Sequence, residues 1–256
     1  MKLIIDSGAT KAEWCIIDYE GENYRFSTEG INATVMSQED IAVIISRAAA
    51  RIAGAEKVRN VYFYGAGIVL PEDGGMPENV KVMDSFFRMA FPKADIEFAS
   101  DILSAARAVC GHDKGIVAIL GTGSNSCLYN GKSIISHINA GGFILGDEGS
   151  GARLGKMFLS DLIKGLVPPD IAKEFAIGHD SSYIGIVNSV YKSQSPSKYL
   201  GSLAPWILDR YEKSDYIRTL TDTNFNDFID RCLLRYEPAP VGVIGGFGFE
   251  NRDILT

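Results

Sequence analysis

Residues 115–129 read GIVAILGTGSNSCLY, and this stretch decides how the chain folds. An apolar run leads into the small residues 121–124 and then into a second apolar run, which predicts strand, glycine turn and strand. Upstream, residues 98–109 read FASDILSAARAV, in which a strand ends at Asp101 and a helix begins. A carboxylate and a turn rich in backbone N–H groups are typical parts of a phosphoryl-transfer site.

The N-terminus repeats this arrangement. Residues 2–18 contain two apolar runs separated by the small-residue turn 7–11, and they predict a β-hairpin. Asp6 ends the first run, where it could hold Mg²⁺ or a water molecule. A plain hairpin, in which Gly8 only supplies a positive φ, is an alternative of equal weight for this turn taken alone. Two such hairpins predict two related lobes, although the sequence identity between them is too sparse to prove a duplication.

Composition excludes several classes of partner. The chain has 256 residues, a net charge of -7 and 46% hydrophobic residues, which fits an ordinary soluble protein of two lobes. A negative chain is a poor match for nucleic acid or for an anionic membrane. The four cysteines are widely spaced, as buried thiols of a cytoplasmic protein would be, and the N-terminus does not resemble a signal peptide.

The segments between the hairpins alternate between helix and strand. Ser37 and Asp40 predict a capping box ahead of a helix that runs to about Ile52. Residues 58–64 and 96–99 predict strands, and residues 79–90 predict a helix. From Asp147 the pattern becomes helical, and residues 168–236 are mostly helical, without a motif that we can place. Residues 241–244 predict a late strand that ends at paired glycines, and a final helix is expected beyond residue 256.

The ordered set of motifs resembles the BadF/BadG/BcrA/BcrD-type ATPases and, within them, the N-acetylglucosamine kinases of the sugar kinase, heat-shock chaperone and actin superfamily. The motifs that carry the resemblance are DSGATK at 6–11, Asp101, GTGSN at 121–125, GDEGS at 146–150 and the glycine pair 245–246. The resemblance implies an α/β fold with two ribonuclease-H-like lobes, residues 1–111 and 112–256, whose mixed sheets are flanked by helices around an ATP cleft. It also implies a cytoplasmic enzyme and makes a homodimer a candidate assembly.

The same resemblance implies a role for each motif residue. Asp101 would be the base that accepts the proton of a sugar hydroxyl, and Asp6 would hold Mg²⁺, through water. The ATP phosphates would lie on Ser7, Gly8, Ala9, Thr10, Lys11, Gly121, Thr122, Gly123 and Ser124. The adenosine would lie on Gly245 and Gly246. The sugar, most simply N-acetylglucosamine, would contact Asn32, Thr122, Ser124, Gly141, Gly142 and Asp147.

Alternatives stay open at this point. Asp101 could instead cap the helix 102–110, although a base is favoured by its place beside a glycine-turn motif. The chain could be an ATPase that activates a radical dehydratase, but Cys127 has no neighbouring partner for an iron–sulfur cluster. It could also be a nucleotide- or sugar-binding regulator without turnover. His137 is expected to be a hydrogen-bonded structural residue, because the three histidines are too dispersed for a zinc site.

Overall fold

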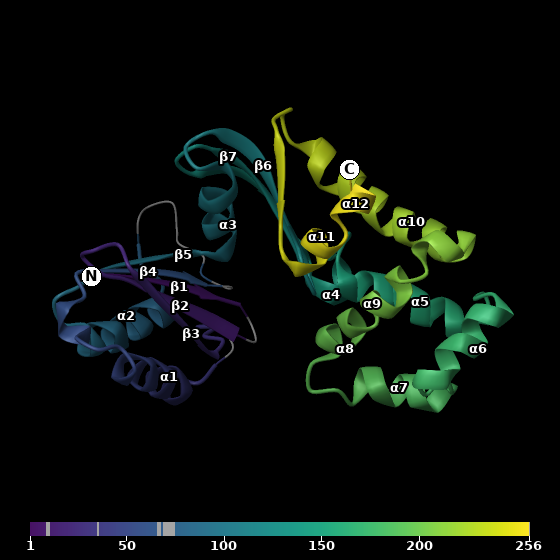
Figure 1. The fold of residues 1–256 in the computed structure, drawn as a ribbon, viewed down its shortest axis with the longest axis horizontal. Coiled ribbons are helices and arrows are strands. Elements are labelled where there is room, and N and C mark those ends of the chain that lie inside the picture. The colour runs from purple at the N-terminus through teal and green to yellow at the C-terminus, as the bar shows by residue number, and fades with distance from the viewer. Residues whose placement is uncertain (9–10, 35, 66–67, 69–74, 256) are drawn as a thin grey trace. The chain divides into compact units, whose positions relative to one another are not determined.

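The chain divides into two compact units, Met1–Ser104 and Ala105–Thr256. The computed structural model describes residues 1–8, 11–34, 36–65, 68 and 75–255. The division falls inside helix α3 (Asp101–Cys110), whose C-terminal part belongs with the second sheet, since Val109 lies against Gly242. The predicted lobe limits assign all of α3 to the first lobe and stay a prediction. Each unit is described by itself (Figure 1).

The first unit is built on a five-stranded mixed sheet of order β3-β2-β1-β4-β5. Its strands are β1 (Lys2–Ser7), β2 (Lys11–Ile17), β3 (Asn23–Glu29), β4 (Asn60–Gly65) and β5 (Asp95–Ser100). Strands β1, β2 and β3 form an antiparallel meander, and β4 and β5 continue the sheet in parallel with β1. The predicted hairpin is confirmed: the Gly8 N–H donates to the Lys11 carbonyl over 3.0 Å.

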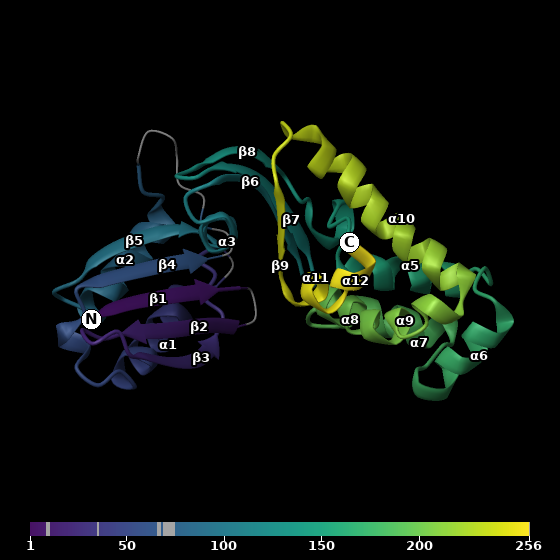
Figure 2. The ribbon, with the colours of Figure 1, turned by 45° about the horizontal axis from the view of Figure 1, so that its top comes forward.

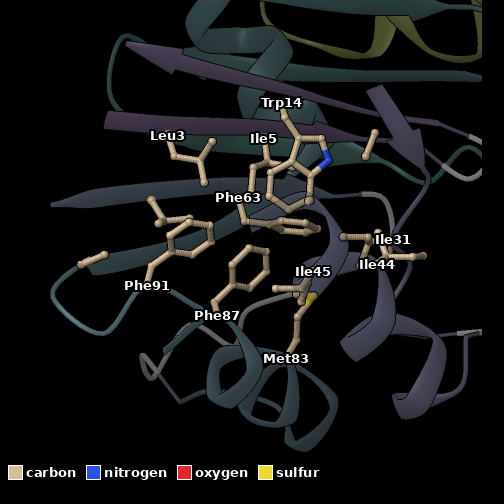
Figure 3. Packing of buried hydrophobic residues seen from close by; sticks show 14 of the residues in the cluster. Leu3, Ile5, Trp14, Ile31, Ile44, Ile45, Phe63, Met83, Phe87 and Phe91 are labelled. Atoms are coloured by element: carbon tan, nitrogen blue, oxygen red, sulfur yellow. The ribbon is translucent and has the colours of Figure 1, made fainter. Parts of the chain in front are cut away.

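Helices α1 (Gln38–Ala50) and α2 (Glu78–Ala90) cover one face of this sheet and close the first core (Figure 3). The predicted capping box is confirmed, because the Ser37 hydroxyl accepts from the Asp40 N–H at 3.1 Å. In the core the ring of Phe87 contacts the rings of Trp14, Phe63 and Phe98 at centroid distances of 6.2, 5.5 and 5.9 Å. Aromatic burial of this extent is the main source of stability for the unit.

The second unit has a four-stranded sheet of order β8-β7-β6-β9, which Figure 2 shows most openly. Its strands are β6 (Lys114–Leu120), β7 (Ser124–Asn130), β8 (Ile134–Ile138) and β9 (Val241–Ile244). Strand β7 pairs with β6 on one side and β8 on the other, both antiparallel, and β9 pairs with β6 in parallel. The predicted second hairpin and late strand are therefore confirmed.

The remaining chain of the second unit is helical, as predicted, with breaks after Gly178, around Ser195 and at Ser214. The helices are α4 (Gly142–Leu145), α5 (Gly151–Ile163), α6 (Pro169–Gly178), α7 (Tyr183–Tyr191), α8 (Pro196–Ser202), α9 (Ala204–Leu208), α10 (Asp215–Arg231), α11 (Gly246–Glu250) and α12 (Arg252–Leu255). The short 3₁₀ turns of this unit are η2 (Tyr211–Lys213) and η3 (Leu233–Arg235), and η1 (Ala55–Lys57) belongs to the first unit. Trp206 on α9 packs with Phe158 and Phe175 in the core of these helices.

The start of α5 differs from the prediction. The sequence predicted helix from Asp147, but α5 begins at Gly151, with the Ser150 hydroxyl as its cap. Asp147 and Gly149 have φ angles of 55° and 76°, which lie in the left-handed region that a right-handed helix excludes. Segment 146–150 is therefore a loop that precedes α5 and is not part of the helix. No helix in the described part of the chain is long and apolar enough to cross a membrane.

Candidate active site

The first unit gathers its predicted site residues at the carboxyl ends of its parallel strands. Registers pair Ser7 with Gly65, and Gly65 with Ser100, so β1, β4 and β5 end at one edge. Asp6 lies one residue before that edge and Asp101 directly after it. Ligands of open α/β sheets bind outside the carboxyl ends of the strands. The topology thus brings both predicted carboxylates to the edge where a ligand is expected.

The charges at this edge favour a cation. Partial loss of hydration raises the pKa of Asp6, and the negative charges of Asp101 and Glu13 raise it further. Glu13 is opposite Asp6 in the β1–β2 ladder, and its own pKa is lowered chiefly by its hydrogen bond with Lys11. The Asp6 carboxylate therefore lies in a field of negative charge, which a bound Mg²⁺ would neutralise.

Ser7 and Asn32 are connected through the backbone of Ile31. The Ser7 hydroxyl is fully buried, donates to the Ile31 carbonyl at 3.0 Å and accepts from the Ile31 N–H at 2.7 Å. This double contact holds the loop that carries Asn32 against the end of β1. The side chain of Ser7 therefore holds this loop in place, and its contact with a phosphate stays a prediction. The predicted phosphate residues Ala9 and Thr10 lie outside the described residues.

Asp101 is the first residue of α3, and its Oδ1 accepts from the Ile102 N–H at 2.8 Å. The Ser100 hydroxyl accepts from the Leu103 N–H at 3.4 Å, which is the bond expected of a helix cap. Capping of α3 is thus supplied in part by Ser100. The role of Asp101 as base stays a prediction.

In the second unit the glycine turn and the glycine pair meet. Strands β6 and β9 are parallel, with Ile119 opposite Ile244, so the residues after them lie at one edge. A side chain on Gly245 would contact the Leu120 carbonyl oxygen at 2.4 Å, and its φ is 109°. Gly245 therefore serves the close approach of two backbones, whereas a side chain on Gly246 would meet no atom within 4 Å.

A pocket of about 630 Å³ opens at this edge. Its walls come from the glycine turn, the start of α5, the α8–α9 region and α11. The lining residues are Gly121, Thr122, Gly151, Gly201, Ala204, Pro205, Leu208, Asp209, Gly246, Phe247, Glu250 and Asn251. Mostly small residues face the pocket, and this leaves room for a flat ligand against backbone. We refer to it as the glycine pocket.

The glycine turn 121–124 is held by hydrogen bonds within itself and with the start of α5. The Gly121 N–H donates to the Gly123 carbonyl at 2.9 Å, while the Gly121 and Thr122 carbonyls accept from the first two N–H groups of α5 at 3.0 Å. Within the described part of the chain, no hydrogen bond is formed by the N–H groups of Thr122 and Gly123. Two adjacent backbone donors of this kind can bind an anion.

Asp147 contacts the same turn from the loop 146–150. Its Oδ1 accepts from the Ser124 N–H at 3.4 Å, and its carboxylate lies so close to Gly123 that a side chain there would meet Oδ2 at 2.9 Å. Burial raises the pKa of Asp147, the Ser124 N–H opposes that rise, and the charge of Glu148 adds to it. Three predicted sugar residues, Thr122, Ser124 and Asp147, are thus together, and Gly141 follows β8 nearby, where the Asp147 N–H donates to the Ala140 carbonyl at 2.9 Å.

Among solved structures, one has a sequence clearly related to this chain. The sequence matches no protein-family model, and no curated protein matches it. A structure of a proposed N-acetylglucosamine kinase from Porphyromonas gingivalis is 37% identical, covers 100% of this chain and 89% of its own, and has a TM-score of 0.88. The chain belongs to this family of sugar kinases. It is a kinase that phosphorylates a sugar hydroxyl.

More distant structures agree on the fold. A proposed N-acetylglucosamine kinase from Chromobacterium violaceum is 20% identical with a TM-score of 0.72, over 98% of this chain and 89% of its own. A ROK family glucokinase from Streptomyces griseus, solved with glucose and AMPPNP, is 17% identical with a TM-score of 0.57, over 97% of this chain and 84% of its own. The kinase therefore has the predicted α/β fold of sugar kinases, with two sheets flanked by helices.

Residues that the sequence motifs do not indicate also line the glycine pocket. Gly201, Ala204 and Asp209 line the glycine pocket from the helical stretch 168–236, to which we had assigned no role. One signal was available: Gly201 stands in a helix, where glycine costs about 1 kcal/mol relative to alanine, so it calls for a packing reason. The reason is contact with Thr122, whose Cγ2 would be 3.2 Å from a side chain at Gly201.

The hydrogen bond predicted for His137 is confirmed, whereas the prediction of buried cysteines holds for Cys127 and Cys232 and not for Cys15 and Cys110, which are half-buried. All four cysteines are free thiols, and Cys127 is fully buried, with burial raising its pKa to about 12. His137 is hydrogen-bonded through Nε2 to the Asn125 Oδ1 at 2.8 Å. Among the described residues no three His, Cys, Asp or Glu side chains form a metal-binding group.

Proposed function

We propose that this sugar kinase transfers the γ-phosphoryl group of ATP to an amino sugar, N-acetylglucosamine first, and that it is of the BadF/BadG/BcrA/BcrD type. The observation that carries the proposal is the glycine pocket, in which Gly121 and Thr122 lie beside Gly246. These are the motifs expected to bind the phosphates and the adenosine of ATP. The amino sugar is supported by the name of the 37% identical relative.

Each edge has its own part in the proposed reaction. The N–H groups of Thr122 and Gly123 bind phosphate oxygens and stabilise the charge that develops on them. Asp101 accepts the proton of the sugar hydroxyl, late in the transfer, when the bond to phosphorus is forming. Asn32, Ser124, Gly141, Gly142 and Asp147 orient the sugar.

Asp6 supplies the place for Mg²⁺ in this proposal, because the negative charges around it raise its pKa and a cation relieves them. A bound Mg²⁺ would neutralise charge on the ATP phosphates. Gly8 and Lys11 extend the same edge, and Lys11 forms an ion pair with Glu13. An incoming triphosphate would compete with Glu13 for the Lys11 ammonium.

The radical-dehydratase alternative lacks support. Iron–sulfur clusters are held by several cysteine thiolates, whereas Cys127 is a buried thiol whose pKa burial raises to about 12. The cysteines Cys15 and Cys110 are only half-buried, but the described residues include no cluster of ligands.

A coupled ADP-release assay across hexoses and hexosamines tests the proposal. We expect ADP formation that depends on the sugar and that is fastest with N-acetylglucosamine, and mass spectrometry should find one added phosphoryl group on the sugar. Release of ADP at the same rate without sugar would identify an ATPase instead. Binding of both ligands without ADP would identify a regulator.

A further inference from the structure

Asn224 is a fully buried polar residue in the middle of α10, far along the sequence from every predicted motif. Its side chain makes two hydrogen bonds with the loop 146–150. Oδ1 accepts from the Gly149 N–H at 3.1 Å, and Nδ2 donates to the Ser150 carbonyl at 3.1 Å. Buried amides are expected to be paired, but bonding to two consecutive backbone groups fixes a loop in one conformation.

That loop is directly connected to the glycine turn. Ser150 caps α5 through its hydroxyl, which accepts from the Arg153 N–H at 3.1 Å. The first two N–H groups of α5, from Gly151 and Ala152, donate to the carbonyls of the turn at 3.0 Å each. A continuous series of hydrogen bonds therefore runs from Asn224 through Ser150 and α5 to Gly121 and Thr122.

Charged side chains of α10 hold the same loop at a second point. Glu148 is almost buried and pairs with Arg153 at 3.0 Å and with Arg231 of α10 at 3.3 Å. Arg153 also forms an ion pair with Asp227 of α10. The Glu148–Arg153 pair is largely buried, and breaking it would leave an uncompensated charge, whereas Arg231 is exposed and its pair with Glu148 adds little.

We infer that Asn224 is a positioning residue for nucleotide binding: through loop 146–150 it fixes the orientation of the Thr122 and Gly123 N–H groups. This inference rests on the proposed function, in which those groups bind the phosphates of ATP. Helix α10 would then position the nucleotide site in addition to packing in the core. Positioning at this level matters because a shift of about 1 Å can cost on the order of a hundredfold in rate.

The test compares Asn224→Asp with Thr221→Val. The aspartate keeps the shape and the acceptor for Gly149 but places an oxygen against the Ser150 carbonyl. Thr221 lies one turn earlier on α10, is also fully buried, and has an Oγ1 without a hydrogen-bond partner in the described structure, so valine replaces it at little cost. We expect Asn224→Asp to raise KM for ATP about tenfold or more. KM for the sugar should rise as well, because Asp147 of the same loop is assigned to the sugar. Thr221→Val should leave both within about twofold.

Hydrogen exchange supplies a readout that needs no activity. In Asn224→Asp the amides of Gly151 and Ala152 should exchange on the order of tenfold faster, as expected when a series of hydrogen bonds loses its support, while those of α6 should not change. An unchanged KM for ATP, or unchanged exchange at 151–152, would overturn the inference. If Asn224→Asp does not fold, Asn224→Ser is measured in the same way against Thr221→Val. A wild-type protein without sugar-dependent ADP release would defeat the proposed function, whereas the exchange result would still decide whether Asn224 fixes the loop.

Discussion

The carboxyl edges of the two sheets have the same strand–turn–strand origin but different chemistry. In the first unit the edge carries Asp6 and Asp101, and partial burial together with the charge of Asp101 raises the pKa of Asp6. In the second unit the corresponding edge carries Gly121 and Gly245 and presents backbone. One topology thus supplies side-chain carboxylates in one unit and backbone N–H donors in the other. A phosphoryl transfer needs both kinds of group, a base with a cation site and a neutral phosphate cradle.

The largest effect is expected at Asp101 in the first unit. Asp101→Asn keeps the size of the side chain and its acceptor for the Ile102 N–H, but it cannot take up a proton. We expect kcat to fall by about 10²–10⁴, the usual contribution of a general base. Binding of a nonhydrolysable ATP analogue, measured by calorimetry, should be retained. Turnover at the wild-type rate in Asp101→Asn would show that the reaction does not need the Asp101 carboxylate, and the contrast between the two edges would then be wrong.

An intermediate effect is expected from the packing behind the glycine pocket. A side chain on Gly155 of α5 would contact the Leu200 carbonyl oxygen at 2.1 Å, so Gly155→Ala must push α8 away and shift Gly201 in the pocket wall. We expect a loss of about 1–3 kcal/mol in the free energy of unfolding, as for other overpacked cores, together with weaker ATP binding. Chemical denaturation and calorimetry measure the two.

Gly178→Ala is the matched control for that change. Gly178 ends α6, and a side chain there would meet no atom within 4 Å. The alanine should be neutral or slightly stabilising, because it restricts the unfolded chain. If both variants lowered ATP affinity alike, the glycine edge would not depend on the close contact of α5 with α8.

The smallest effect concerns Asp6 in the absence of nucleotide. Because its folded-state pKa is raised, protonated Asp6 favours the folded state, and that stability is lost as pH rises through the folded pKa. Asp6→Asn should therefore raise the melting temperature of the ligand-free protein near pH 7. The free energy of unfolding should rise by no more than about 0.5 kcal/mol, because this side chain is exposed. The gain should vanish below about pH 4, the ordinary pKa range of aspartate. A lower melting temperature at pH 7 would show that the carboxylate is stabilised at this edge, contrary to the comparison.

Much of this architecture was predictable from local patterns. Both hairpins, the capping box at Ser37 and the late strand before Gly245 follow from alternation, turn residues and caps, which act over a few positions. The loop 146–150 was not predictable. The sequence pattern predicted a helix there, whereas Asp147 and Gly149 adopt left-handed φ angles. Those angles depend on partners such as Asn224, more than seventy positions away.

Contacts of long sequence separation explain what was missed at the candidate site. Asp6 and Asp101 were each predicted at the end of a strand, and the parallel pairing of β1, β4 and β5 brings the two to one edge. The α8–α9 wall of the glycine pocket depends on Gly155 admitting the backbone of Leu200, a tertiary fit without a local pattern. The hydroxyl of Ser7 is likewise paired with the backbone of Ile31, a contact of long sequence separation that no local pattern indicates.

The placement of Trp14 and Trp206 gives the molecule two built-in optical reporters. The chain has two tryptophans, one in each unit. Trp14 is fully buried and donates to the Thr28 hydroxyl at 2.9 Å, whereas Trp206 lies beneath the Arg210 guanidinium at 3.7 Å, in the helix that lines the glycine pocket. Their emission should therefore differ in wavelength and quenching. Replacing either one with phenylalanine leaves a spectrum that follows a single unit, so the melting of the carboxylate half and nucleotide occupancy of the glycine half can be recorded separately by fluorescence.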